Sequence, residues 1–240
     1  MTTTNKPICN AGLANCLELY QGITDTDLVH LNFGEAAPRF AEHTVPARRT
    51  IFHRGETIEG IPIICSGWAV TVSTLPNSRR QIISVLLPGD LVSGALVFSD
   101  KLDFTVEAIT NVIYHCYDRT EFCAAMSANP SLNQTILKAW NEEYLRIVQS
   151  VISLGQCTAE ERVSRLLLNL FERLALRGLV TDHTFNFPMR QTHIAEMTGL
   201  TPVHISRVFN NLRQQGLIDL ADRTVTVRDP VALRRQANAA

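Results

Sequence analysis

The spacing of apolar positions changes twice along the chain. From about residue 44 to about residue 119 apolar and polar residues alternate in short runs rich in Val, Ile and Thr. Turn-forming residues interrupt these runs at 54–56, 66–67, 76–78 and 88–90. Short strands separated at this spacing by glycine-containing turns predict a closed barrel or a double-sheet jelly roll.

After residue 119 the apolar residues recur every three or four positions, which predicts helices. The longest such stretch begins at Asn129-Pro130 and runs to residue 154. A seam of this length between two folded units favours dimerisation through the helix, although the same stripe could serve as intramolecular core. The positions predicted for the dimer helix are Leu132, Ile136, Trp140, Ile147 and Val151. A shorter helix is expected near residues 24–33, with Thr24 as its N-cap.

Residues 192–217 contain two short amphipathic helices separated by a glycine-centred turn. Gly199 tolerates the positive φ that the residue at the end of a helix often adopts. Thr201 follows at an N-cap position, and Pro202 occupies the first helical position, where its missing N–H costs nothing. The second helix has one apolar face, formed by Ile205, Val208, Phe209 and Leu212.

The opposite face of that second helix carries short or forked hydrogen-bonding side chains: His204, Ser206, Arg207, Asn210 and Asn211. This arrangement is typical of a helix-turn-helix whose second helix enters the DNA major groove, whereas a generic helical hairpin usually carries Glu and Lys there. Residues 218–227 then predict a hairpin turned at 221–223. The hairpin would make this a winged helix-turn-helix.

Composition and charge agree with a globular, two-part chain. The net charge is −1, but from Thr158 onward there are 11 Arg and no Lys against 8 acidic residues. A mildly basic C-terminal part fits a DNA-reading module, with modest non-specific affinity. No apolar run could span a membrane, and no signal-peptide core is present, so we expect a cytoplasmic protein with reduced cysteines.

Three short segments of the β region resemble the Crp/Fnr family of bacterial transcription regulators: HRGE with Gly55, CSGWAVTV with Gly67, and RRQIISVLLPGDLV with Gly89. Their order, followed by the helix-turn-helix, carries the resemblance over most of the chain. It implies an α+β fold with an N-terminal double-stranded β-roll like a cyclic-nucleotide-binding domain. We predict a leader and β-roll at 1–126, a dimerisation helix at 127–157 and a winged helix-turn-helix at 158–240.

The resemblance also points to the residues that contact DNA. Arg207 is the expected base reader, because its guanidinium can bond O6 and N7 of guanine together. The family motif E-x-x-S-R places its Ser-Arg pair on Ser206 and Arg207, but its acidic position falls on Val203, so the target sequence is open. His204 is a possible substitute reader. Thr201, Arg190, Gln191 and Thr192 stand at helix N-termini and are the predicted phosphate contacts, with possible additions from Arg213, Arg223 and Arg228.

The signal that the β-roll senses is not determined by the sequence. Relatives that bind cyclic AMP hold its phosphate with an Arg followed by a small residue, whereas this chain has Phe104-Thr105 there, so we predict no response to cyclic AMP. Neither an iron–sulfur cluster nor haem is favoured. Cys9, Cys16 and Cys116 are weak candidates for a cluster, and His30, His43, His53 and His115 for haem. A thiol redox switch also stays open.

The sequence thus predicts a homodimeric regulator that binds an inverted-repeat promoter site and contacts RNA polymerase. The rival is a regulatory subunit that does not bind DNA and uses the β-roll for ligand or protein contacts. No metal-spaced His/Cys set, nucleophile elbow or glycine-rich phosphate loop appears in the sequence, so no enzyme is predicted.

Overall fold

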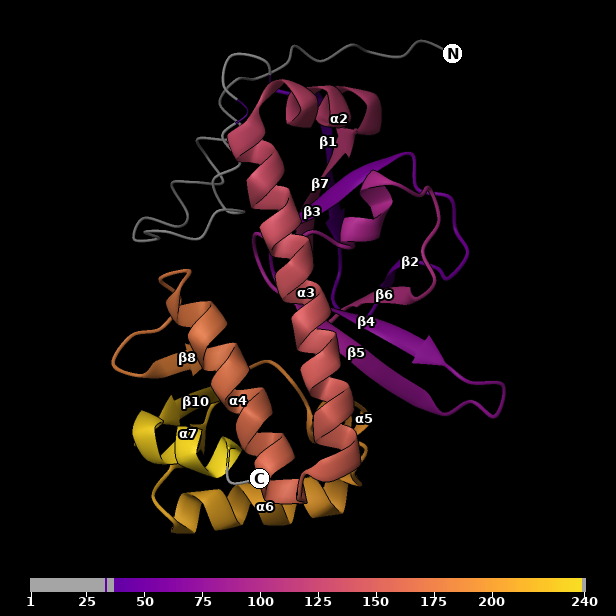
Figure 1. The fold of residues 1–240 in the computed structure, drawn as a ribbon. Helices are drawn as coiled ribbons and strands as arrows, with labels where there is room; N and C mark the ends of the chain where they lie inside the picture. The colour runs from indigo at the N-terminus through magenta and orange to yellow at the C-terminus, as the bar shows by residue number, and fades with distance from the viewer. Residues whose placement is uncertain (1–32, 34–36, 239–240) are drawn as a thin grey trace.

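A computed structural model describes residue 33 and residues 37–238 (Figure 1). The N-terminal part is the predicted double-sheet β-roll. One sheet has the order β1 (Phe40–Val45), β7 (Val112–Asp118), β3 (Gly60–Ser66). The other has the order β2 (Thr50–Phe52), β6 (Thr105–Ala108), β4 (Ala69–Thr74), β5 (Arg80–Leu86). The pairs within both sheets are antiparallel. The first strand begins at residue 40, four residues before the predicted limit.

The β-roll encloses an apolar core, and a glycine makes one of its turns possible. In β6, the buried Val106 and Ala108 alternate with partly buried neighbours, as expected for a strand with one face in the core, whereas β3 is buried continuously from Gly60 to Ile64. Gly67, between β3 and β4, has φ of 85°. A Cβ at this position would lie 2.0 Å from the carbonyl oxygen of Asn111. Both conditions restrict the turn to glycine.

Two helices lead out of the β-roll. Asp118 caps α2 (Arg119–Ala128), and Asn129 caps α3 (Pro130–Gln156), with the side-chain oxygen of each accepting a backbone N–H. Proline at the first position of α3 lacks a donor that the helix would leave unpaired. The helix α3 runs along the β-roll and continues to the C-terminal helices, so it spans the length of the molecule (Figure 1).

The helix α3 has two apolar faces rather than one seam. Leu132 and Ile136 are 3% and 2% exposed and belong to the core of the β-roll. Their assignment to a dimer seam was therefore wrong, because the intramolecular alternative applies to the first two turns. The ring of Trp140 packs against that of Phe98, with the ring centroids 5.3 Å apart, and Ile147 is partly buried. Trp140 and Val151, eleven residues apart and so on nearly the same side of the helix, are 39% and 64% exposed.

The second face of α3 is apolar and uncovered. Leu137, Tyr144 and Val151 lie seven residues apart, and Leu145 and Ile152 repeat the same interval beside them. All five are exposed large apolar side chains. A seven-residue apolar interval places side chains along one stripe of a helix, as a helix partner requires.

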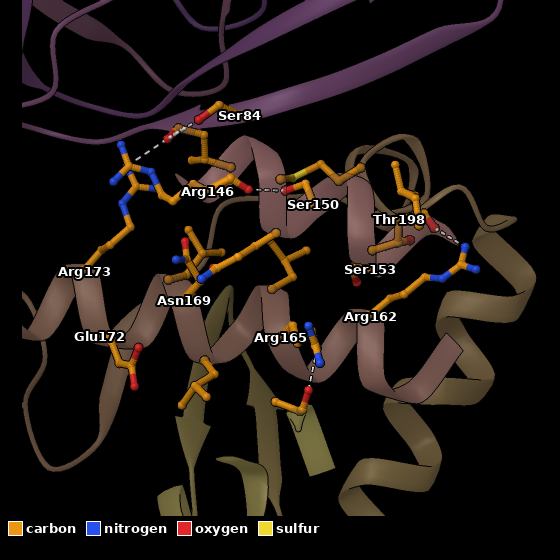
Figure 2. A pocket seen from close by; sticks show the side chains of 18 of the residues that line it. Ser84, Arg146, Ser150, Ser153, Arg162, Arg165, Asn169, Glu172, Arg173 and Thr198 are labelled. Carbon is orange, nitrogen blue, oxygen red and sulfur yellow. Dashed lines mark hydrogen bonds between the residues drawn. The ribbon is translucent and has the colours of Figure 1, made fainter. Parts of the chain in front are cut away.

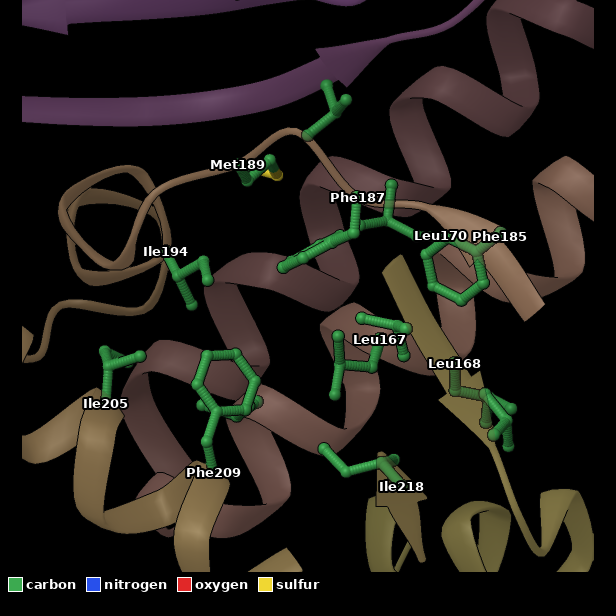
Figure 3. Close-up of a cluster of buried hydrophobic side chains, with 14 of the residues drawn as sticks. Leu167, Leu168, Leu170, Phe185, Phe187, Met189, Ile194, Ile205, Phe209 and Ile218 are labelled. Carbon is green, nitrogen blue, oxygen red and sulfur yellow. The ribbon is translucent and has the colours of Figure 1, made fainter. Parts of the chain in front are cut away.

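The C-terminal part is a winged helix-turn-helix. It comprises α4 (Ala159–Ala175), β8 (Thr184–Asn186), α5 (Gln191–Thr198), α6 (Pro202–Gln214), β9 (Ile218–Ala221), β10 (Thr224–Val227) and α7 (Pro230–Ala237). The predicted capping box of Thr158 and Glu161 opens α4. The core lies between α4, α5, α6 and the small sheet; Figure 3 shows Leu167, Leu170, Phe185, Ile194, Ile205 and Phe209 turned toward one another.

The two parts share a packed interface. Trp68 of the β-roll makes an edge contact with Phe187, with ring centroids 6.5 Å apart, and both side chains are buried. Gln81 of β5 donates to the carbonyl oxygen of Met197 in α5 at 3.1 Å. Arg80 bonds Glu107 at 2.7 Å and also pairs with Glu196 of α5 at 3.3 Å. The first helix of the helix-turn-helix is thus attached to the edge strand β5.

A buried charge cluster fastens the same interface. Asp90, in the turn after β5, accepts from Arg173 at 2.5 Å and from Arg177 at 2.6 Å, both at the end of α4 or just beyond it. Arg177 also donates to the carbonyl oxygen of Pro88 at 2.7 Å. Burial opposes ionisation of Asp90, but the two guanidinium ions outweigh it and hold the pKa of Asp90 below its ordinary value. The carboxylate is therefore the counter-ion of two buried cations.

The helix predicted near residues 24–33 falls almost entirely outside the described residues. Among the residues that the structure does describe, none of the helices is both long and apolar enough to cross a membrane.

Candidate nucleic-acid interface

The turn between α5 and α6 follows the chemistry that the sequence predicts. Gly199 ends α5 in the left-handed conformation, with φ of 67°. Thr201 then caps α6, its Oγ1 accepting the backbone N–H of His204 at 3.2 Å, and Pro202 takes the first helical position. The apolar face of α6 is buried against α4 and α5 through Ile205, Val208, Phe209 and Leu212. These contacts fix which face of α6 is turned to solvent.

The predicted base readers lie on the free face of α6. Val203, His204 and Arg207 are exposed, Val203 at 64%, and Ser206 is partly buried. Asn210 is exposed one turn after Ser206. Asn211 differs from the prediction, because its amide donates to Glu160 of α4 at 2.8 Å. The helix therefore presents Val203, His204, Ser206, Arg207 and Asn210 on one side, with the first four in its N-terminal half, where major-groove helices contact base edges.

The predicted phosphate contacts are exposed at the N-termini of α5 and α6. Arg190, Gln191 and Thr192 are exposed at the start of α5, and Thr201 is exposed at the start of α6. The backbone N–H of Arg190 donates to Nδ1 of His193 at 3.2 Å. Burial lowers the pKa of His193, so its ring is the neutral acceptor that this bond requires. The exposed N-terminal turns retain the positive end of the helix dipole, which attracts phosphate.

The hairpin of β9 and β10 forms the predicted wing. Its turn residues Asp222 and Arg223 have φ of 47° and 61°, values typical of a tight two-residue hairpin turn. Arg223 and Arg213 are exposed, whereas Arg228 pairs with Asp219 at 2.6 Å on the surface. Within the described residues, neither Arg213 nor Arg223 forms an ion pair with a carboxylate, so both are available to contact DNA.

Phe104 and Thr105 stand at the positions where an Arg and a small residue would be expected in a cyclic-nucleotide sensor. Phe104 is partly buried against the β-roll core, next to Thr105 at the start of β6. The 3-10 helix η1 (Gly94–Val97) packs on α3 so closely that a Cβ at Gly94 would lie 2.7 Å from the Trp140 ring. No Arg occupies the cassette position that the family uses for the phosphate.

The weak metal candidates are not assembled in the described part of the chain. Cys9, Cys16 and His30 lie outside the described residues. Cys116 is partly buried in β7, and burial raises the pKa of its thiol, which disfavours the thiolate form. His115 is buried, stacks on Phe40 and lies 3.2 Å from Glu42. Within residues 37–238, no group of three or more His, Cys, Asp or Glu could hold a metal ion.

Sequence reasoning missed the charge cluster of Asp90, Arg173 and Arg177. The sequence signals were an aspartate directly after the Pro88-Gly89 turn and two arginines four residues apart on one helix face. Spacing alone could not show that the aspartate meets the two arginines, because Asp90 lies more than 80 residues before them and belongs to the other domain.

An exposed reading helix, a wing and a β-roll define a DNA-binding regulator with a sensor-type domain. Comparison with known proteins agrees. Residues 42–129 match the cyclic nucleotide-binding domain, and residues 161–236 match the Crp-like helix-turn-helix domain. The chain belongs to the Crp/Fnr family of transcription regulators.

The relatives include two proteins that are 30% identical to this chain. The nitrogen fixation regulation protein FixK of Bradyrhizobium diazoefficiens aligns over 222 residues, covering 89% of this chain and 91% of the relative. The transcriptional activatory protein AadR of Rhodopseudomonas palustris aligns over 220 residues, covering 91% and 87%. Among solved structures, FixK2 from Bradyrhizobium japonicum superposes with a TM-score of 0.75 at 24% identity, covering 84% of this chain and 99% of that one. The last comparison supports the fold.

Replacing the cap residue Thr201 by Ala is expected to cost about 1 kcal/mol of unfolding free energy, because one N–H of the first turn of α6 loses its acceptor. Urea unfolding followed by circular dichroism measures this change. Thr192→Ala, also exposed and in the first turn of its helix, is the control and should change stability by less than about 0.5 kcal/mol. Equal stability of the two variants would show that the Thr201 cap has no energetic role.

Proposed function

We propose that this regulator binds an inverted-repeat promoter site as a homodimer, with Arg207 and Ser206 of each α6 reading base edges in successive major grooves. The exposed face of α6, held by the buried face behind it, is the observation that carries the proposal. Val203 and His204 lie on the same face and would contact bases, while Arg190, Gln191, Thr192 and Thr201 would hold phosphates. The division into units at 1–126, 127–157 and 158–240 belongs to this proposal.

The uncovered apolar face of α3 supports the dimer. In a two-fold arrangement, a second copy of α3 would cover the stripe of Leu137, Tyr144 and Val151. Such a dimer would carry two reading helices related by the same two-fold axis. Its half-sites would then be an inverted repeat, spaced by about one helical turn of roughly 10 bp.

Selection from a random double-stranded DNA pool tests the function. Purified protein should enrich an inverted repeat with half-site centres one helical turn apart. Enrichment of single, unpaired half-sites would contradict the dimeric arrangement, and enrichment of no sequence would contradict specific DNA reading.

Placing a charge on the α3 stripe is expected to dissociate the dimer. Val151→Glu would put two like charges into a two-fold apolar interface, and we expect a dimer at least roughly a hundredfold weaker. Sedimentation velocity across a concentration series measures this change. Val231→Glu on α7 is the matched control, because Val231 is 60% exposed, close to the 64% of Val151. Equal dimer affinity in both variants would place the interface elsewhere.

The β-roll is proposed to work without cyclic AMP, since the cassette offers apolar side chains and no Arg to a cyclic phosphate. Promoter-bound dimers would act through contacts with RNA polymerase. Several relatives, among them FnrA of Stutzerimonas stutzeri, are transcriptional activator proteins, which supports this part of the proposal.

A further inference from the structure

A cavity of about 340 Å³ lies where β5, α3, α4 and α7 meet (Figure 2). In Figure 2, Arg146 and Ser150 come from α3, and Arg162, Arg165, Asn169 and Arg173 come from α4. Ser84 reaches the cavity from β5, while Arg234 of α7 completes the lining on another side. The volume is within the range of small-ligand sites. The cavity is separate from the cassette region at η1 and β6.

The cavity is strongly cationic. Its lining includes five arginines, which are Arg146, Arg162, Arg165, Arg173 and Arg234, and the acidic residue among the lining residues is Glu172. Glu172 forms an ion pair with Arg234. Asp90, just behind the wall, balances Arg173. Glu143 of α3 lies close to Arg146 and lines a small neighbouring hollow with it. The five lining arginines still outnumber these three carboxylates.

Structural hydrogen bonds account for part of this set. Arg162 donates to the carbonyl oxygen of Thr198 at 3.1 Å, and Arg165 donates to that of Ala237 at 2.5 Å. Both bonds hold the guanidinium groups at the cavity wall and use only some of the five N–H donors of each group. The remaining donors are available to a ligand.

The guanidinium of Arg146 has no such hydrogen bond within the described part of the chain, although Asp90 and Glu143 lie near it. Its Nε is buried and has no hydrogen-bond partner, and the buried Nε of Arg173 is also unpaired. Buried donors without acceptors are rare in folded proteins because their desolvation is not compensated. Two unpaired guanidinium donors lining one cavity therefore indicate a missing acceptor.

The cavity would stay open in the proposed dimer. Residues two positions apart on an α-helix point about 200° apart around its axis. Arg146 and Ser153 line the cavity, while Tyr144 and Val151, each two positions earlier, belong to the exposed stripe. A second α3 packed on the stripe would cover the opposite side of the helix.

We propose that this cavity binds a small phosphorylated metabolite, with its phosphate against the unpaired Nε–H groups of Arg146 and Arg173 (Figure 2) and its less polar part against Leu154, Leu166 and Met197. Guanidinium groups pair with phosphate through two parallel hydrogen bonds, which suits a site with several forked donors. The apolar lining residues favour a ligand with an organic part over a bare ion. Because the walls come from the β-roll, α3 and the DNA-binding domain, such a ligand would bridge all three.

Titration calorimetry of the full-length protein in low-salt buffer, without DNA, tests the site with inorganic pyrophosphate as the probe. The wild type should bind with a dissociation constant of about 0.1 mM or tighter. Arg146→Gln should weaken binding at least about tenfold, because one charged donor is removed. Arg79→Gln, an exposed arginine in the turn between β4 and β5, is the matched control and should leave binding unchanged.

A second variant gives a result of opposite sign. Glu172→Gln removes the carboxylate from the lining and should tighten pyrophosphate binding by about threefold or more. Adenosine monophosphate should then bind more tightly than phosphate alone, and adenosine should not bind. Absence of pyrophosphate binding, or equal binding by wild type, Arg146→Gln and Glu172→Gln, would overturn the proposal. Since no DNA is present, this outcome is independent of the proposed promoter binding.

Discussion

Asp90→Asn is expected to destabilise the protein by about 3–5 kcal/mol, although the side chain keeps its size. The substitution removes the shared counter-ion of two buried guanidinium groups, Arg173 and Arg177, and leaves two uncompensated charges in the domain interface. Chemical denaturation at neutral pH measures the loss. Asp219→Asn is the matched control, because its pair with Arg228 lies on the surface and is worth at most about 1 kcal/mol.

The effect of Asp90→Asn should depend on pH in one direction. The folded pKa of Asp90 lies below its ordinary value, so its stabilisation is fully present above the unfolded value of roughly 3.9. It is lost as the pH falls through the folded pKa. The difference between wild type and variant should therefore be constant near pH 7 and shrink at acidic pH. A difference that grows on acidification would contradict the assignment of Asp90 as the ionised partner.

The second large effect is expected at the DNA-reading helix. Arg207→Ala should lower specific affinity by roughly 1–3 kcal/mol per half-site, and a dimer loses this contribution twice. It should also relax the base preference at one position of each half-site. Fluorescence anisotropy with the selected inverted repeat, and with versions mutated at each position, measures both changes.

Two further variants separate the guanidinium fork from its charge. Arg207→Lys keeps the charge but loses the paired donors, so discrimination should fall while the salt dependence of binding stays close to that of wild type. Arg235→Ala, on the exposed side of α7, is the control for a general loss of positive charge. If Arg207→Ala and Arg235→Ala behaved alike, Arg207 would be a phosphate contact or a surface residue instead of a base reader.

Local chemistry was sufficient to predict the elements of the DNA-binding domain. Gly199, Thr201 and Pro202 determine where α5 ends and α6 begins through conformations and hydrogen bonds within a few residues, and such signals are readable in one sequence. The exposed face of α6 followed from the same periodicity. The target base sequence could not be predicted, because Val203 replaces the acidic residue of the family motif.

Long-range pairing was the part that the sequence did not reveal. Leu132 and Ile136 continue the same apolar repeat as Val151, yet the first two meet the β-roll core and the third meets solvent. Periodicity gives the apolar stripe but does not show which surface covers each part of it. The same limit applies to Asp90, whose partners lie in another domain. The cavity at Arg146 likewise depends on how the domains pack.

The contact between Trp68 and Phe187 in the domain interface limits how easily the DNA-binding domain can rotate relative to the β-roll. Any rotation of the DNA-binding domain away from β5 must bring these two buried side chains into water, and each exposure costs at least about 1.5 kcal/mol. Without replacement contacts, a rotated form would be populated by fewer than about one molecule in a hundred. A signal that repositions the reading helices must therefore bind the rotated form more tightly by a comparable free energy. The described orientation of the two domains is thus a strongly populated ground state. The domains do not sample many orientations of similar free energy.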